Sequence, residues 1–215
     1  MTYLEIVNAV MRRLREDEVT TVDESDYSKL IGDFVNDAKR LVEDSWSWTA
    51  LRATQTITTV VGTATYSLTD FGVRGKVNSV HNETDNIVVR EESLQRIREQ
   101  NLGTNNANGT INYWAVDGVD GSGDIKLRLY QTPNSVKTLT VYGTKRPSDL
   151  SSDSDELLVP SSPVIQWAYA YALRERGETG GESGSEQAIF AQNDLATAIS
   201  LDSQYHPEEM IWETI

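Results

Sequence analysis

The feature that most constrains this chain is a change of hydrophobic period, from helical to alternating near residue 53 and back to helical near residue 150. Outside that stretch, apolar residues recur every three to four positions, which is the spacing of one helix face. Inside it, β-branched residues alternate with polar ones in short runs that end at Gly, Asp or Pro. No single type of element fits both periods, so the sequence predicts an α+β protein.

Two helices are predicted at each end of the chain. Thr2 and Glu5 form a capping box before the first helix, and Ser25 suits the N-cap of the second. At the C-terminal side, Ser162 and Pro163 open a helix to Arg176, and a last helix covers residues 186–201. Their apolar stripes are expected to form the core of a four-helix bundle, built from Leu4, Val7, Met11, Leu14, Leu30, Ile31, Phe34, Val35, Trp167 and Leu173.

The middle of the chain is predicted to be a large antiparallel β insertion into that bundle. About six strands are expected, beginning with a hairpin that turns near Gly62, and residues 91–100 fit a short helix. The expected organisation is a discontinuous bundle of residues 1–52 and 150–205, a β-rich insertion of residues 53–149 and an extended tail of residues 206–215.

Charge is distributed unevenly along the chain. The net charge is −14, and residues 150–215 hold 2 basic and 12 acidic residues. Binding to a phosphate backbone requires Lys and Arg, so this balance argues against ordinary nucleic-acid binding. Three interpretations remain open: a solvated face, an acidic wall past which DNA slides, or a surface that docks on a basic partner.

Residues suited to catalysis or metal binding are scarce. The chain has no cysteine, and its two histidines, His81 and His206, are far apart. It lacks the nucleophile-elbow, Walker, zinc-protease and dinucleotide-binding motifs. Asp117, Asp120 and Asp124 have the wrong spacing for an EF-hand loop and suit a hairpin turn. We therefore expect no enzymatic activity, no cofactor and no metal, and we also expect no signal peptide and no membrane span.

The C-terminal tail is unusually apolar for a chain end. Met210, Ile211, Trp212 and Ile215 fall within its last six residues. The tail is expected either to pack on its own bundle or to insert into a groove of another chain with Trp212 as the anchor. The last helix is rich in alanine (188, 191, 196 and 198), which permits close helix approach within or between subunits.

Three patterns together resemble the head-to-tail adaptor proteins of tailed bacteriophages, including the tail tubular A-like and head-completion adaptors. They are Leu4-x-x-Val7-x-x-x-Met11-Arg12-x-Leu14, Leu30-Ile31-x-x-Phe34-Val35-Asn36-x-Ala38 and Trp48-x-x-Leu51-Arg52. The Gly62-x-x-x-Tyr66-x-Leu68 strand and the helix led by Pro163 are similar too.

This resemblance implies a structural virion protein at the head–tail interface, made in the host cytoplasm. It implies a homo-oligomeric ring, usually a dodecamer, beneath the portal protein, with the tail of residues 210–215 reaching the portal. The β insertion would meet a tail nozzle or fibre protein, and phage DNA would pass through the channel without sequence-specific binding. The β insertion is larger than in a simple adaptor.

Two other functions fit the sequence. The β insertion could recognise a host receptor or glycan through exposed aromatic residues, with Tyr113, Trp114, Tyr130 and Tyr142 as candidates. Alternatively, the acidic C-terminal region could act as a DNA mimic or assembly chaperone, which requires a continuous acidic surface on a monomer or dimer.

Overall fold

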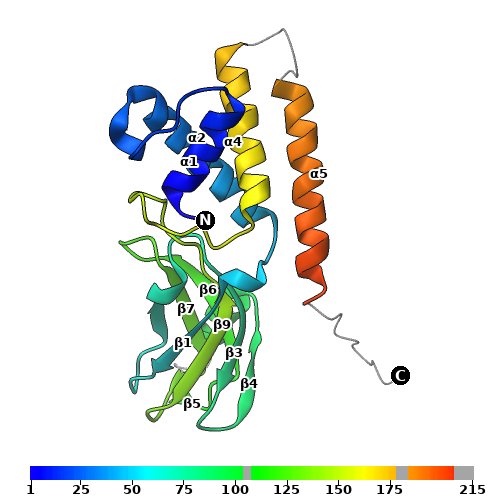
Figure 1. Ribbon diagram of the computed structural model, residues 1–215. Helices are drawn as coiled ribbons and strands as arrows, with labels where there is room; N and C mark the ends of the chain where they lie inside the picture. The colour runs from blue at the N-terminus through cyan, green and yellow to red at the C-terminus, as the bar shows by residue number, and fades with distance from the viewer. Residues whose placement is uncertain (104–107, 178–183, 206–215) are drawn as a thin grey trace, which may run out of the picture. The chain divides into compact units, whose positions relative to one another are not determined.

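The computed structural model describes residues 1–103, 108–177 and 184–205, and the chain divides into two compact units (Figure 1). The first, named the helical unit, is formed by Met1–Ala50 and Asp149–Ile215. The second, named the β unit, is formed by Leu51–Ser148. The chain thus leaves the helical unit once, builds the β unit, and returns to complete the helical unit.

The first two helices begin where their capping residues predict. The Thr2 hydroxyl of α1 (Tyr3–Arg13) accepts from the Glu5 N–H at 3.3 Å, and the Glu5 carboxylate accepts from the Thr2 N–H at 2.9 Å. Ser25 and Ser28 make the equivalent pair at the start of α2 (Asp26–Ser45). First-turn N–H groups have no partner inside a helix, so these side chains set where each helix begins.

The C-terminal helices are α4 (Ser161–Arg176) and α5 (Gly184–Ser203). Helix α4 packs against α1, α2 and α5, whereas α5 lies mainly along α4. Helix α4 begins at Ser161, so Pro163 lies within its first turn rather than at its first position. A proline is tolerated there because first-turn N–H groups have no partner in the helix.

A buried side chain of α2 holds the returning chain in the helical unit. The Leu150 N–H donates to Asn36 Oδ1 at 2.9 Å, and Asn36 Nδ2 donates to the Leu150 carbonyl at 3.0 Å. Asn36 Nδ2 also lies 3.4 Å from the hydroxyl of Tyr3 on α1. The side-chain amide of Asn36 therefore hydrogen-bonds both the N–H and the carbonyl of Leu150, as a neighbouring strand would, and also contacts Tyr3 of α1.

The β unit contains a seven-stranded sheet with the order β1-β9-β3-β4-β6-β7-β2. All neighbours pair antiparallel except β4 and β6, which run parallel and are connected through α3 (Leu94–Gly103). A separate pair joins β5 (Asn108–Gly109) to β8 (Thr132–Pro133). The main strands are β1 (Arg52–Thr58), β2 (Thr65–Leu68), β3 (Lys76–Asn82), β4 (Ile87–Glu91), β6 (Tyr113–Val119), β7 (Ile125–Tyr130) and β9 (Thr138–Thr144).

The sheet curls until its two edges almost meet. Gln55 of β1 bridges them, because its Nε2 donates to the Ser67 carbonyl of β2 at 3.5 Å and its Oε1 accepts from the Asp70 N–H at 3.2 Å. The curled sheet encloses an apolar core in which Trp114 and Phe71 are fully buried. Near closure leaves little unpaired edge for another strand to join.

Two predictions about the fold are wrong. A four-helix bundle with a β insertion does not describe the chain, because the nearly closed seven-stranded sheet is dominant and the described residues contain five α-helices. Helix α3 belongs to the β unit, and α5 lies mainly along α4. The hairpin at Gly62 is also wrong, because β1 pairs with β9 and β2 pairs with β7 at opposite edges of the sheet. The turn at Gly62 instead spans the gap where the sheet closes.

Candidate functional site

The predicted tail site lies outside the described residues. Met210, Ile211, Trp212 and Ile215 all fall in that part of the chain. Their proposed contact with a portal therefore stays a prediction.

The ten predicted bundle-core residues divide into two groups in the helical unit. Six of them are buried: Val7, Met11, Leu14, Ile31, Val35 and Leu173. The other four, Leu4, Leu30, Phe34 and Trp167, are only half-buried. Helical spacing identifies the inward side of a helix, but it does not distinguish a core position from one at the margin of a groove.

Phe34 borders a hollow between α2 and α4, named here the aromatic hollow. It measures about 500 Å³ and is lined by Phe34, Asp37, Tyr171, Arg174 and Glu175. The Phe34 and Tyr171 rings meet edge to face, with centroids 6.2 Å apart. Burial raises the pKa of Tyr171, and the Asp37 carboxylate raises it further, so its phenol stays neutral at physiological pH. The lining of the hollow therefore combines two aromatic rings with three charged side chains, Asp37, Arg174 and Glu175.

Trp167 extends the same aromatic surface along α4. Its ring centroid lies 5.9 Å from that of Tyr171, one helical turn further on. Phe34, Trp167 and Tyr171 therefore form one aromatic row across two helices. The sequence prediction placed Phe34 and Trp167 in the core and did not identify this row.

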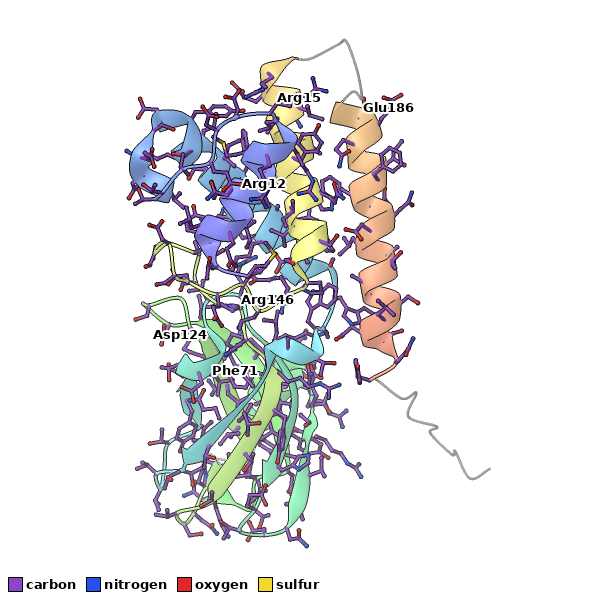
Figure 2. All side chains as sticks on the ribbon, viewed as in Figure 1. Arg12, Arg15, Phe71, Asp124, Arg146 and Glu186 are labelled. Carbon is purple, nitrogen blue, oxygen red and sulfur yellow. The ribbon has the colours of Figure 1, made fainter. Side chains whose placement is uncertain are left out.

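Helix α5 has apolar residues on two sides. Gln187, Ala191 and Leu195 are buried, whereas Ile189, Phe190 and Leu201 are 60%, 55% and 60% exposed. These three exposed residues are named the α5 ridge. Figure 2 shows side chains extending from α5 both toward α4 and away from it. A helix that is apolar on both sides is typically covered on both sides in its working state.

The β unit has an apolar tip formed by two loops. Val60, Val61 and Val136 are each more than half exposed, and together they are named the valine tip. The Thr59 N–H donates to the Lys137 carbonyl at 2.8 Å, which holds the two loops side by side. A hairpin that turns near Gly62 would place Val60 and Val61 in its first strand, but β1 ends at Thr58.

The aromatic candidates for glycan binding do not form an exposed platform. Trp114 is 2% exposed within the core of the β unit. Tyr113 and Tyr130 are half-buried, with their ring centroids 6.3 Å apart, and Tyr142 is 38% exposed and packs edge to face against His81 at 5.0 Å. Their alternation into and out of the sheet follows the period of a strand.

The Asp117–Asp124 segment comprises the end of β6 and the turn of residues 120–124 that leads into β7. Asp117 pairs with Arg98 at 2.8 Å and with Arg128 at 3.1 Å. Burial opposes its ionisation, but hydrogen bonds from both arginines outweigh burial and leave the pKa of Asp117 below its ordinary value. Asp120 accepts from the Ser122 and Asp124 N–H groups, which is ordinary turn chemistry. In the described ranges, no three His, Asp or Glu side chains come close enough together to hold a metal ion.

No helix within the described residues has the length and apolar content needed to cross a membrane. The search of curated proteins found no match to the chain.

The comparison with protein families gives one assignment. The model of the SU10 adaptor protein family matches residues 1–208, which include both the helical unit and the β unit. The match confirms the resemblance to phage head-to-tail adaptors that the sequence patterns indicated. The chain belongs to the SU10 adaptor protein family.

Proposed function

We propose that this chain is a structural adaptor that forms a ring between the portal and the tail of a bacteriophage and continues the DNA exit channel. The observation that carries this proposal is the family match over residues 1–208. The exposed apolar surfaces on both units support it, because a chain that works alone rarely presents several of them.

Each part of the chain has a role in this proposal. The helical unit forms the body of the ring, and the tail with Trp212 as anchor binds the portal protein. The valine tip of the β unit contacts a tail nozzle or fibre protein. The protein acts by holding its partners in place and catalyses no reaction.

The acidic balance of residues 150–215 suits a channel for DNA. Carboxylates that face the duplex repel its phosphates, so the DNA slides without adhering. Attraction would instead hold the genome at the exit and delay its release.

The experiment that tests this function measures the mass of the full chain in solution by light scattering, alone and with the cognate portal ring. We expect the chain either to bind the portal as it assembles or to bind it as a preformed ring. A chain that stays monomeric or dimeric and does not bind the portal would contradict the proposal.

A deletion of residues 210–215 separates the tail's role from that of the ring. We expect the shortened chain to fold, as judged by circular dichroism, and to lose portal binding. A matched control replaces Glu208 and Glu209 by glutamine, which removes tail charge but leaves Met210, Ile211 and Trp212 in place. An unfolded deletion variant would indicate that the tail belongs to this chain's own core.

A further inference from the structure

The valine tip is an apolar surface carried on a firmly held loop. Its three valines are each more than half exposed, yet the backbone around them is hydrogen-bonded within the β unit. We infer that the valine tip is a preformed plug that enters an apolar groove on the tail nozzle or fibre protein, and that Tyr66 is the residue that positions it. This inference rests on the proposed function and deepens it, because it names the chemistry of the partner surface and a positioning residue.

The first argument is the kind of residue found at the turn. Residues 60–63 form a β-turn, closed by a hydrogen bond from the Thr63 N–H to the Val60 carbonyl at 3.0 Å. Gly62 has a φ of +81°, which glycine adopts without steric cost. The exposed positions of a turn are ordinarily polar, but here Val60 and Val61 occupy them. Exposed apolar groups at such positions are typical of a surface that another molecule covers.

The second argument is the rigidity of the turn. Tyr66 of β2 reaches back to it, and its hydroxyl accepts from the Val60 N–H at 3.0 Å and donates to the Thr63 carbonyl at 2.8 Å. The Gly62 N–H donates to the Pro133 carbonyl at 3.0 Å, which ties the turn to the second loop of the tip. A surface that is already ordered loses little conformational entropy when it binds, so the turn is suited to a specific contact.

The third argument is the placement of the valines. Strand β1 pairs Thr58 with Thr138, and the hydrogen bond between Thr59 and Lys137 continues that register. The next pair in the register is Val60 with Val136, and cross-strand partners of this kind have their side chains on the same side. The two valines therefore form one apolar patch, with Val61 beside it in the turn.

The tip also lies away from the rest of the chain. It follows the end of β1 and precedes the start of β9, whereas the chain enters the β unit before β1 and leaves it after β9. Each strand has seven residues, which span about 20 Å. The tip can therefore be held by one partner while the helical unit is held by another.

Charge indicates which kind of partner fits. Lys137 and Asp85 form an ion pair beside the tip, with Nζ and Oδ1 2.6 Å apart, so their charges offset each other. The exposed Glu83 adds a negative charge in the same region, where its N–H donates to the Thr138 carbonyl at 2.9 Å. This charge opposes contact with phosphates, whether of DNA or of an anionic membrane. An apolar groove on a protein is the surface that matches the tip.

The inference is tested in phage particles that carry the full chain. Val61→Asp would place a charge in the apolar groove, and we expect at least tenfold fewer tailed particles in electron micrographs, with the adaptor still present on the heads. Val119→Asp is the matched control and should leave tail attachment unchanged. Val119 is 54% exposed, against 55% for Val61, and it pairs with Ile125 at the other end of the sheet. Val60→Thr combined with Val61→Thr keeps the shape of both side chains and should lower tail attachment in the same direction.

Tyr66→Phe tests the positioning role, because it keeps the ring and removes only the hydroxyl. We expect the amide hydrogen of Val60 to exchange at least tenfold faster and tail attachment to fall. In a chain that already carries Val61→Asp, the same change should cause no further loss of tails, since both act through the valine tip. A further, additive loss would indicate a general structural role for Tyr66 and would overturn its assignment.

The other outcomes separate this inference from the proposed function. Normal tail attachment by Val61→Asp particles, with portal binding intact, would overturn the inference and keep the adaptor function. Loss of portal binding by Val61→Asp would place the tip at the portal and would also overturn it. Binding of the natural chain to phosphatidylcholine vesicles, abolished by Val61→Asp, would identify a membrane contact and overturn it as well. A natural chain that does not bind the portal would contradict the proposed function itself.

Discussion

Replacing Asn36 by alanine is expected to destabilise the helical unit strongly. The side-chain amide makes two buried hydrogen bonds to the backbone of Leu150, at 2.9 and 3.0 Å, and Tyr3 lies 3.4 Å away. Alanine cannot form either hydrogen bond, so the Leu150 N–H and carbonyl would both be left buried without a hydrogen-bond partner.

The magnitude follows from those two groups. An unpaired buried N–H or C=O costs about 1–3 kcal/mol, and partial entry of water reduces that cost. We therefore expect the free energy of unfolding to fall by about 2–4 kcal/mol, the combined cost of two partly hydrated groups. For a unit of this size, the midpoint of thermal unfolding should fall by roughly 10 °C or more.

Asn36→Asp gives a sharper version of the same test. The aspartate still accepts from the Leu150 N–H, but when ionised it cannot donate to the Leu150 carbonyl and faces it with a negative charge. The protonated acid can donate again. Unlike Asn36→Ala, this variant should therefore regain part of its stability relative to the natural chain as the pH falls from about 7 toward about 4.

The assay is urea unfolding followed by the helical signal in circular dichroism, with both variants compared to Lys29→Ala. Lys29 is an exposed residue of the same helix, and its replacement should change stability by less than about 0.5 kcal/mol. If Asn36→Ala behaves like Lys29→Ala, the amide does not hold the returning chain and the reasoning is refuted.

Three further predictions concern other parts of the chain. Gly143→Ala should lower the stability of the β unit by about 2–3 kcal/mol in calorimetry, since a methyl group there would collide with the backbone of β3, whereas Gly121→Ala, in open space, should change little. Burial and nearby carboxylates raise the pKa of Tyr3 to about 12. The stability that the neutral Tyr3 phenol gives the folded chain is therefore complete below about pH 10 and is lost as the pH rises toward 12. Tyr3→Phe should remove this loss of stability at alkaline pH, as measured by pH-jump unfolding. The pKa of Asp117 is lowered, so its ion pairs stabilise the β unit above about pH 4 and are lost in acid. Asp117→Asn should be less stable than the natural chain at neutral pH and should lose less stability on acidification. Equal slopes of unfolding free energy against pH for the variant and the natural chain would contradict this.

Local signals predicted the starts of helices but not the way the strands pair. The first two helices begin where Thr2 and Ser25 predict, because capping depends on residues only three positions apart. The pairing of β1 with β9 joins residues eighty or more positions apart, and no local pattern specifies it. The parallel pairing of β4 with β6 depends on the α3 connection and was also not predicted.

The candidate surfaces illustrate a related limit. Phe34 and Trp167 follow the helical period of core residues, yet both are only half-buried: Phe34 lines the aromatic hollow, and Trp167 packs beside Tyr171. Val60 and Val61 have strand-forming side chains, but they stand exposed where the sheet closes. In each case the burial of the side chain depends on which elements of the fold pack against it, and the neighbouring residues in the sequence do not determine that.

The two ends of the β unit lie next to each other, since the Lys145 N–H donates to the Leu51 carbonyl at 2.8 Å. Adjacent ends are the property that allows one folded domain to be inserted into another at a single point. We therefore expect that a short linker could replace the β unit in the chain, or that another domain could be inserted at the same place. Exchange of residues 51–148 at these two positions would change the whole surface of the β unit while the rest of the chain keeps its sequence.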